Sequence, residues 1–203
     1  MSLPPPDRPV THVYDAAYAG VPNWDIGRPQ RAFLELLDAG LVRSPVLDVG
    51  CGTGELALFL ARQGFDVLGI DLSTLAIQQA TEKARYRRIP AHFLVWDALD
   101  IGELRAKGLQ FQTVLDSAMF HVLGDLERTV FIEGLGDVVQ SGGLYCVLGD
   151  ARTDRRSIYG LTPAELRRRF GAAGGWEVVF SYRTVFERRW GGSKAYFVGV
   201  QRT

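Results

Sequence analysis

Three glycines spaced two residues apart close an apolar run in Val46-Leu-Asp-Val-Gly-Cys-Gly-Thr-Gly54. The apolar part is nearly continuous, as in a strand that is buried on both faces of a sheet. Gly50, Gly52 and Gly54 remove side chains where the backbone must bend and where a ligand touches the main chain. A helical pattern over residues 55–63 follows at once. The run therefore predicts a strand, a tight ligand-binding turn and a helix in succession.

The residue after the turn limits which ligand can bind. The dinucleotide fingerprint G-x-G-x-x-G requires glycine at position 55, where the chain has Glu55. A carboxylate at the start of a helix repels a pyrophosphate, which binds at that end. The chain also lacks a Tyr-x-x-x-Lys pair. An NAD(P)-binding Rossmann oxidoreductase is therefore the disfavoured alternative.

Short apolar runs alternate with amphipathic ones along the rest of the chain, which predicts a parallel sheet with helices on both faces. The last two strands follow one another through a turn at 191–193 and should form an antiparallel hairpin. We expect an α/β, Rossmann-like fold with a doubly wound, mostly parallel seven-stranded sheet and an antiparallel C-terminal hairpin. The strands are predicted at 45–50, 66–71, 91–96, 111–116, 144–148, 176–186 and 194–201. The predicted N-caps of three helices are Ser73, Asp125 and Thr162.

The chain of 203 residues, 47% apolar, is long enough for one sizeable core and shows no linker to a second domain. We expect a single domain over 1–203. Four prolines predict a flexible tail at 1–10, followed by N-terminal cap or lid helices at 11–44 and the sheet core at 45–203.

Four aspartates lie in or at the ends of four consecutive parallel strands: Asp48, Asp71, Asp97 and Asp116. Ligands of such sheets bind beyond the carboxyl ends of the strands. Asp71 ends the second strand, the position from which a carboxylate accepts both hydroxyl groups of an adenosine ribose. Any one of the four could instead cap a loop. Together they predict a ligand that carries an adenosine and no phosphate.

At this point the sequence resembles the class I S-adenosylmethionine-dependent methyltransferases over roughly residues 45–150. Their D-x-G-x-G-x-G loop matches residues 48–54, their ribose acid matches Asp71 and their adenine-side acid matches Asp97. The resemblance implies S-adenosyl-L-methionine as cofactor, with Leu72 beside the adenine and the Ala98 N–H facing the ring edge. The implied cofactor-binding residues in this region are Asp48, Gly50, Cys51, Gly52, Gly54, Asp71, Leu72, Ser73, Asp97, Ala98 and Asp116.

A second resemblance covers residues 14–30, where Tyr-Asp-Ala-Ala-Tyr precedes Trp-Asp-Ile-Gly-Arg-Pro-Gln. The pattern is similar to the N-terminal signature of the thiopurine and halide/thiol methyltransferase group and its bacterial relatives, in which this segment closes over the cofactor. The resemblance implies that Trp24 lies near the sulfonium and that Arg28 is available to the cofactor carboxylate. The alternative is that Tyr14, Tyr18 and Trp24 only pack as a satellite cluster.

His121 follows the fourth strand, where this superfamily places groups that face the substrate. Because its intrinsic pKa lies near neutrality, we expect it to act as a general base on a hydroxyl, thiol or ring nitrogen. The alternative is a histidine that holds the loop. The expected recognition elements for the acceptor are the N-terminal segment and the stretches 119–122, 152–161 and 188–190.

Charge and composition narrow the possible partners. Lysine plus arginine and aspartate plus glutamate each number 23, so no net charge favours a nucleic-acid backbone. The Asn-Pro-Pro-Tyr motif of amino-group methyltransferases is missing, which weakens a DNA-base or protein-glutamine substrate. Two cysteines and no long apolar window predict a cytoplasmic protein without a membrane partner, and no histidine pattern predicts a metal.

We therefore expect methyl transfer to an O, N or S atom of a small molecule, an aromatic heterocycle or a thiol, and no nucleic-acid partner. The main alternative outside the oxidoreductases is a module that binds the cofactor without turnover. The sequence leaves the oligomeric state open.

Overall fold

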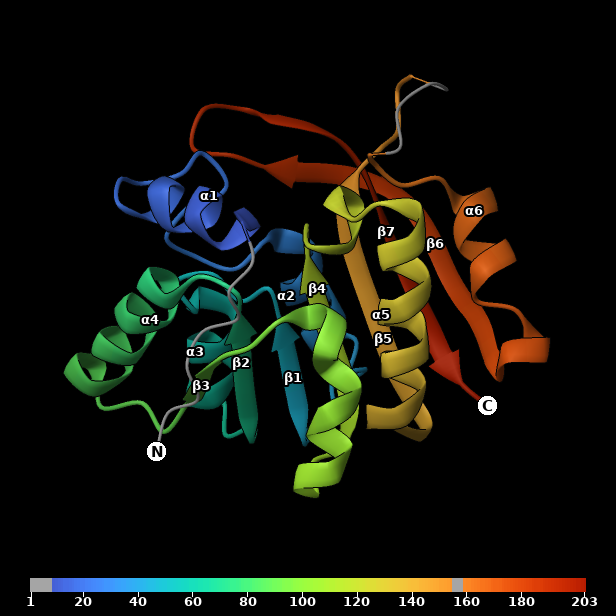
Figure 1. Ribbon diagram of the computed structural model, residues 1–203, viewed down its shortest axis with the longest axis horizontal. Coiled ribbons are helices and arrows are strands. Elements are labelled where there is room, and N and C mark those ends of the chain that lie inside the picture. The colour runs from blue at the N-terminus through green and yellow to red at the C-terminus, as the bar shows by residue number, and fades with distance from the viewer. Residues whose placement is uncertain (1–8, 155–158) are drawn as a thin grey trace.

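A seven-stranded sheet forms the centre of the computed structural model, which describes residues 9–154 and 159–203. The strand order is β3-β2-β1-β4-β5-β7-β6. The first five strands are parallel, and β7 lies antiparallel between β5 and β6. The strands are β1 Val46–Val49, β2 Val67–Asp71, β3 His92–Val95, β4 Phe111–Ser117, β5 Val139–Asp150, β6 Trp176–Glu187 and β7 Gly192–Arg202. The predicted fold class is confirmed (Figure 1).

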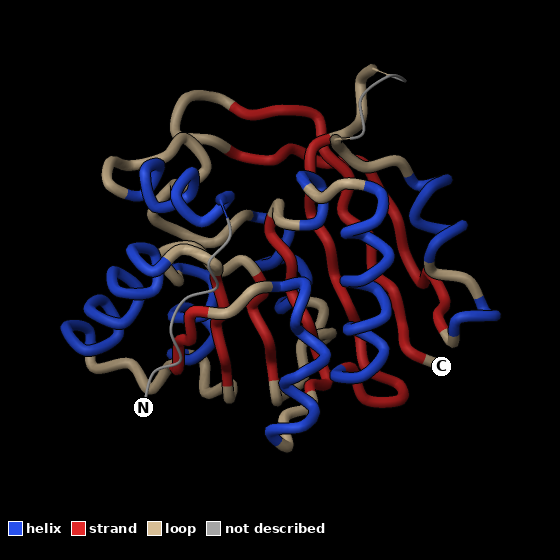
Figure 2. The backbone as a smooth tube through the Cα atoms, in the orientation of Figure 1, coloured by secondary structure: helices blue, strands red, loops and turns tan. Residues whose placement is uncertain are grey.

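Helices cover both faces of the sheet, as Figure 2 shows. One buried cluster packs η1, α5 and α6 on one face, and a second packs α2, α3 and the end of α4 on the other. The α-helices are α1 Pro9–Tyr18, α2 Arg31–Asp38, α3 Glu55–Arg62, α4 Thr74–Arg87, α5 Asp125–Val138 and α6 Pro163–Arg169. Three 3-10 segments are η1 Ala98–Lys107, η2 Phe120–Val122 and η3 Ala172–Gly174.

The helix starts agree with the sequence at two of the three predicted caps. The Ser73 hydroxyl accepts the N–H of Ala76 at the start of α4, and Thr162 does the same for Glu165 in α6. The prediction for α5 is wrong by one residue, because the cap is Gly124 and Asp125 lies inside the first turn.

Other boundaries also differ from the prediction. The hairpin turn falls at 188–191, so that residues 192 and 193 belong to β7 instead of the turn. The strand β5 begins five residues early, at Val139, directly after α5. The 3-10 segment η1 has no counterpart in the prediction, because its apolar residues do not follow a 3.6-residue period.

The N-terminal segment lies at the end of the sheet where the parallel strands terminate, with the β6–β7 connection above it in Figure 1. Gln30 and Glu187 exchange two hydrogen bonds, of 2.8 and 2.9 Å, that join the two segments. The helix α1 begins at Pro9, inside the expected tail, since proline fits the first helical position. Residues 1–8 of that tail lie outside the described residues.

Candidate functional site

The glycine turn after β1 is shaped by close neighbours. Gly50 and Gly52 have φ angles of +67° and +53°, which side chains rarely allow. A Cβ atom at Gly50 would lie 2.8 Å from the Cβ of Met119, and one at Gly52 would lie 2.6 Å from the Tyr18 hydroxyl. The turn therefore needs glycine at both positions, and it presents bare backbone to the cavity beside it.

Asp71, at the end of β2, is held by the turn it faces. Its carboxylate accepts the N–H of Gly52 at 2.8 Å and the N–H of Ser73 at 2.8 Å. Burial raises the pKa of Asp71 to about 6. Each oxygen keeps a further lone pair, so the fixed carboxylate can still accept hydroxyl groups from a ligand in the cavity that it lines.

Asp97 lies two residues after the end of the neighbouring strand β3 and caps η1. Its carboxylate accepts the N–H of Leu99 at 2.9 Å. Asp97 lines the same cavity as Asp71, and so do Leu72 and Ala98. The structure therefore brings together four of the residues that the resemblance implies for the ribose and the adenine.

The other two aspartates hold neighbouring elements in place and do not line the main cavity. Asp48 accepts the N–H of Ala57 at 3.1 Å and so ties β1 to α3. Asp116 accepts the N–H of Met119 and the hydroxyl of Tyr145, both at 2.8 Å. Burial raises the pKa of each carboxyl to about 7. Asp48 lines only a smaller second cavity, and Asp116 lines neither, because it lies under the loop after β4.

Ser73 and Gly54 also lie beneath the ligand surface and line neither cavity. The Ser73 hydroxyl donates to the Asp15 carboxylate at 2.5 Å, which fixes α1 to α4. Gly54 caps α3 in a left-handed conformation. Cys51 lines the second cavity, and burial holds the pKa of its thiol well above the ordinary value, which disfavours the thiolate.

The main cavity has a volume of about 230 Å³ and extends past the cofactor-side residues. Apolar, aromatic and charged side chains from the N-terminal segment, the β4–α5 connection and the β6–β7 hairpin form its other half. They are Tyr14, Tyr18, Trp24, Met119, His121, Val122, Leu123, Glu127, Phe186 and Arg188. The second cavity, of about 80 Å³, adjoins it and shares the lining residues Tyr18, Trp24, Gly50, Ser117 and Phe186.

The aromatic residues of the N-terminal segment pack on the glycine turn. The indole N–H of Trp24 donates to the Tyr18 hydroxyl at 3.1 Å, and the two rings meet edge to face. Arg28 lies at the second cavity but pairs with the Glu187 carboxylate, with Nη2 to Oε1 at 2.7 Å. This contact orients the Arg28 guanidinium toward the β6–β7 hairpin.

His121 lies in η2 on the wall of the main cavity, and its side chain is almost fully buried. Its Nδ1 accepts the N–H of Asp150 at 2.9 Å. Its carbonyl oxygen accepts the N–H of Gly160 at 2.8 Å and an N–H of Arg128. The ring of His121 is thus attached to β5, and its backbone is attached to Gly160 and to α5.

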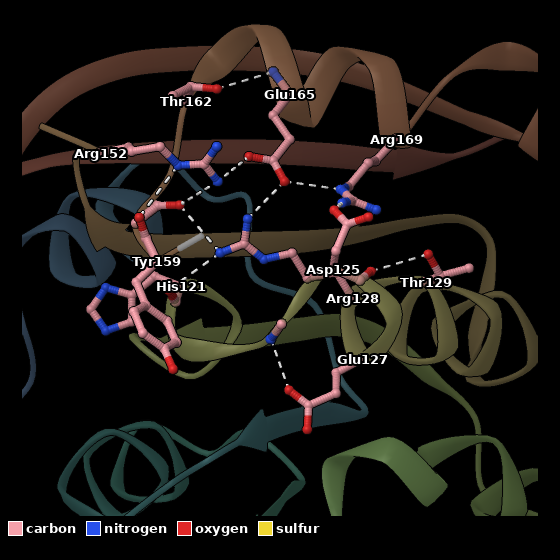
Figure 3. Close-up of polar contacts among 12 residues, drawn as sticks. His121, Asp125, Glu127, Arg128, Thr129, Arg152, Tyr159, Thr162, Glu165 and Arg169 are labelled. Atoms are coloured by element: carbon pink, nitrogen blue, oxygen red, sulfur yellow. Dashed lines mark hydrogen bonds and ion pairs between the residues drawn. The ribbon is translucent and has the colours of Figure 1, made fainter. Parts of the chain in front are cut away.

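A buried ion-pair network behind His121 was not predicted (Figure 3). Arg128 is 1% exposed and donates to the Glu165 carboxylate at 2.7 Å. Arg152 and Arg169 donate to the same carboxylate at 2.6 and 3.0 Å. The sequence does contain a signal, because Arg128 precedes Phe131 and Leu135 at helical spacing and so falls on the buried face of α5.

Within residues 9–154 and 159–203, no group of three or more His, Cys, Asp or Glu side chains could hold a metal ion. No helix found there is long and apolar enough to cross a membrane. Of the expected recognition stretch 152–161, residues 155–158 lie outside the described residues.

Known proteins that are similar to this chain agree with the site described above. The family described as a methyltransferase domain matches residues 46–143. A solved structure described as "Conversion of a Disulfide Bond into a Thioacetal Group during Echinomycin Biosynthesis" is 32% identical, with a TM-score of 0.80, over 95% of this chain and 92% of that one. The chain is an S-adenosylmethionine-dependent methyltransferase.

Two other relatives bear on this methyltransferase. The 2-heptyl-1-hydroxyquinolin-4(1H)-one methyltransferase of Mycobacteroides abscessus is 34% identical over 130 residues, which is 64% of this chain and 56% of that protein. The match thus spans little more than half the length of that relative. A SAM-dependent methyltransferase from Anabaena variabilis is 15% identical, with a TM-score of 0.74 over the whole of both chains, and shares the fold.

Proposed function

We propose that this methyltransferase transfers a methyl group to an O, N or S atom of a small molecule, an aromatic heterocycle or a thiol. The observation that carries the proposal is the main cavity among the described residues, in which Asp71 and Asp97 line one half and Tyr14, Met119 and Phe186 line the other. The cavity would receive both cofactor and acceptor, and its concave, largely apolar wall on the acceptor's side is typical of small-molecule sites. We propose no nucleic-acid partner.

In this proposal the cofactor lies across the ends of β1, β2 and β3. Asp71 accepts the ribose hydroxyls, Leu72, Asp97 and Ala98 surround the adenine, and the glycine turn contacts the methionine part. Asp48, Gly54, Ser73 and Asp116 hold these elements through the contacts described above. Trp24 supplies an aromatic face near the sulfonium, and Arg28 and Cys51 border the second cavity, where the carboxylate of the cofactor would lie.

Bound S-adenosylmethionine supplies an electrophilic methyl group. The chain has to align the acceptor with that group and exclude water. The N-terminal segment and the β6–β7 hairpin enclose the cavity from the side of the solvent, because Gln30 and Glu187 bind one another. Methyl transfer, in which the acceptor displaces sulfur from the methyl carbon, needs few dedicated catalytic residues.

Two relatives support the acceptor class. The name of one contains a hydroxyquinolinone, which is an aromatic heterocycle, and the description of the other names a disulfide that becomes a thioacetal. The similarity of residues 14–30 to the thiopurine and halide/thiol methyltransferase group points the same way and remains part of the proposal.

The test is incubation of the protein with methyl-labelled S-adenosylmethionine and a panel of hydroxyquinolones, heterocyclic thiols and simple amines. We expect labelled product with a hydroxyquinolone or a thiol, and tight binding of S-adenosylhomocysteine by calorimetry. Binding without turnover of any acceptor would favour a cofactor-binding module. Transfer to protein or nucleic acid in place of the panel would contradict the proposal.

A further inference from the structure

The proton arrangement of the His121 ring follows from one hydrogen bond. The backbone N–H of Asp150 donates to Nδ1 at 2.9 Å. An N–H can donate only to a ring nitrogen with a free lone pair, so Nδ1 carries no proton. In the neutral ring the single proton is therefore on Nε2, the nitrogen on the far side of the imidazole.

The surroundings of the ring keep it neutral. Burial lowers the pKa of His121, and the guanidinium groups of Arg188 and Arg128 lower it further, against the Asp150 carboxylate, which raises it. The Asp150 carboxylate lies 3.8 Å from Nδ1 and is engaged by Arg188, whose Nη2 donates to it at 2.6 Å. A second proton on His121 would also point at the N–H of Asp150.

The position of the ring is set by packing as well as by hydrogen bonds. A Cβ atom at residue 149 would lie 2.8 Å from the Cβ of His121, so the glycine there makes room for it. Behind the residue, Arg128 and Gly160 both donate to the His121 carbonyl oxygen, on the side of the network in Figure 3. The ring thus has a fixed place on the cavity wall.

A nitrogen that already carries a proton cannot take one from the acceptor, but it can donate a hydrogen bond. We propose that His121 donates from Nε2 to the methyl acceptor, and that the acceptor is an acidic aromatic hydroxyl or thiol that enters the site already ionised. This inference rests on the proposed function and deepens it. It replaces the general base expected from the sequence with a fixed donor.

The charges around the acceptor's half of the cavity are mixed, since Arg188 is paired with Asp150 and Glu127 is a carboxylate, so the sulfonium of bound cofactor would be the charge that attracts an ionised acceptor. Arg188 lines the same cavity, and bound cofactor adds the positive charge of its sulfonium. Glu127, the carboxylate on this side, accepts the N–H of Gly124 at 2.8 Å at the start of α5. The acceptor's lone pair forms the new bond to the methyl carbon while the carbon–sulfur pair stays with sulfur. An anion and a sulfonium become two neutral products, and no proton has to move.

Nitrogen-15 spectra of the histidine rings test the donor directly. The full chain has three histidines, of which His12 and His92 are exposed and serve as internal controls, and His121→Gln identifies the third signal. We expect a neutral ring with its proton on Nε2 at pH 7.5, with and without S-adenosylhomocysteine. A proton on Nδ1, or a cationic ring at that pH, would overturn the proposal. Failure to bind S-adenosylhomocysteine would instead count against the proposed function.

Kinetics with two thiols test the acceptor class. 4-Nitrothiophenol is ionised at neutral pH, whereas benzyl thiol is protonated. We expect the wild type to methylate 4-nitrothiophenol in preference to benzyl thiol. His121→Gln keeps an N–H but is no base, and it should retain kcat/KM within about tenfold. His121→Leu should lose about 10- to 100-fold more, the size of one hydrogen bond to a charged group.

Equal loss in the Gln and Leu variants, or preference for benzyl thiol, would overturn the proposal. If the wild type methylates neither thiol, the Nε2 signal of the S-adenosylhomocysteine complex is followed while 4-nitrothiophenol is added. A shift of that signal supports the donor contact. An unchanged signal overturns the acceptor class.

Discussion

At the scale of single residues, Asp71 has two tasks that a substitution can separate. It holds the glycine turn through the N–H of Gly52 and it faces the cavity with its remaining lone pairs. Removing the whole side chain would disturb both. Replacement by asparagine keeps one oxygen that can accept the N–H of Gly52, gives up the acceptor for the N–H of Ser73, and removes the charge.

We predict that Asp71→Asn weakens binding of S-adenosylhomocysteine by about 1.5 to 3 kcal/mol, the size of charge-assisted hydrogen bonds to the ribose. Calorimetry measures the dissociation constant, and circular dichroism checks the fold. Asp66→Asn, at the exposed start of the same region, is the matched control and should change nothing. An unchanged dissociation constant in folded Asp71→Asn would remove Asp71 from the cofactor site.

At the scale of secondary-structure elements, Glu165 joins α5 and α6 through three guanidinium groups. Burial alone would raise the pKa of Glu165, but hydrogen bonds from Arg128 and Arg169 lower it. We predict that Glu165→Ala destabilises the protein by about 3 to 5 kcal/mol, because it leaves Arg128 buried without its counter-ion. Urea unfolding measures the loss.

The exposed Glu133→Ala, also on α5, serves as the control for Glu165→Ala and should change the free energy of unfolding by less than about 0.5 kcal/mol. A Glu165→Ala variant as stable as this control would mean that Arg128 finds another partner or water.

The N-terminal segment is a second element whose behaviour can be measured. Asp15 accepts a hydrogen bond from Ser73 at the start of α4, and Asp25 accepts one from Thr53 in the glycine turn at 2.7 Å. Within the segment, Trp24 donates to Tyr18. We predict that amides from 13 to 28 gain protection from hydrogen exchange when S-adenosylhomocysteine binds, because the ligand lies under this segment.

Amides of α6 should exchange equally in both states and serve as the internal reference for the N-terminal segment. Trp24→Ala should lower the turnover rate by a larger factor than its loss of thermal stability can account for. If exchange at 13–28 is the same with and without ligand, and Trp24→Ala is fully active, the segment only packs.

At the scale of the whole molecule, three carboxyl groups of the site make stability depend on pH, of which Asp48 and Asp116 are buried and Asp71 is partly exposed. The pKa of Asp48 and of Asp116 is raised to about 7 and that of Asp71 to about 6, in each case by burial. Because these values exceed the ordinary 3.8, the folded protein holds its protons more tightly than the unfolded chain. The contribution of these groups to stability therefore falls as pH rises from about 4 to 7.

Asp116→Asn tests this pH dependence, since an amide can still accept from Met119 and donate to Tyr145. We predict that the variant gains stability relative to the wild type between pH 5 and pH 8, on the order of 2 kcal/mol, in unfolding curves recorded at both values. Asp38→Asn, which is exposed, should show no such gain. A variant that loses stability at pH 8 would show that the charged form is the favoured one.

The fold could be predicted because the local sequence signals all agree with one arrangement of the sheet. The glycine turn, the cap at Ser73 and the alternation of strands and helices all require the same parallel sheet. The prediction was wrong where the three-dimensional packing, and not a local sequence pattern, sets the conformation: it missed η1 and placed the start of β5 too late. These segments take their conformation from the sheet they pack on.

The candidate site divides in the same way. Asp71 and Asp97 could be placed because a strand end fixes where a side chain points. The sequence could not show that Asp116, unlike Asp71 and Asp97, does not line the cavity, since it is held under the loop after β4 by a hydrogen bond from Tyr145, 29 positions away. The likeness of residues 14–30 to a known segment did not indicate the pairing of Arg28 with Glu187, because that contact joins opposite parts of the chain.

The contact between Gln30 and Glu187 spans 157 positions of sequence. On the ribosome, the glycine turn and the strands β1 to β5 are therefore synthesised before the β6–β7 hairpin that covers the ligand surface. The cover over that surface forms only when β6 and β7 emerge and meet a segment made much earlier. Completion of the cavity therefore has to wait until β6 and β7 have been synthesised.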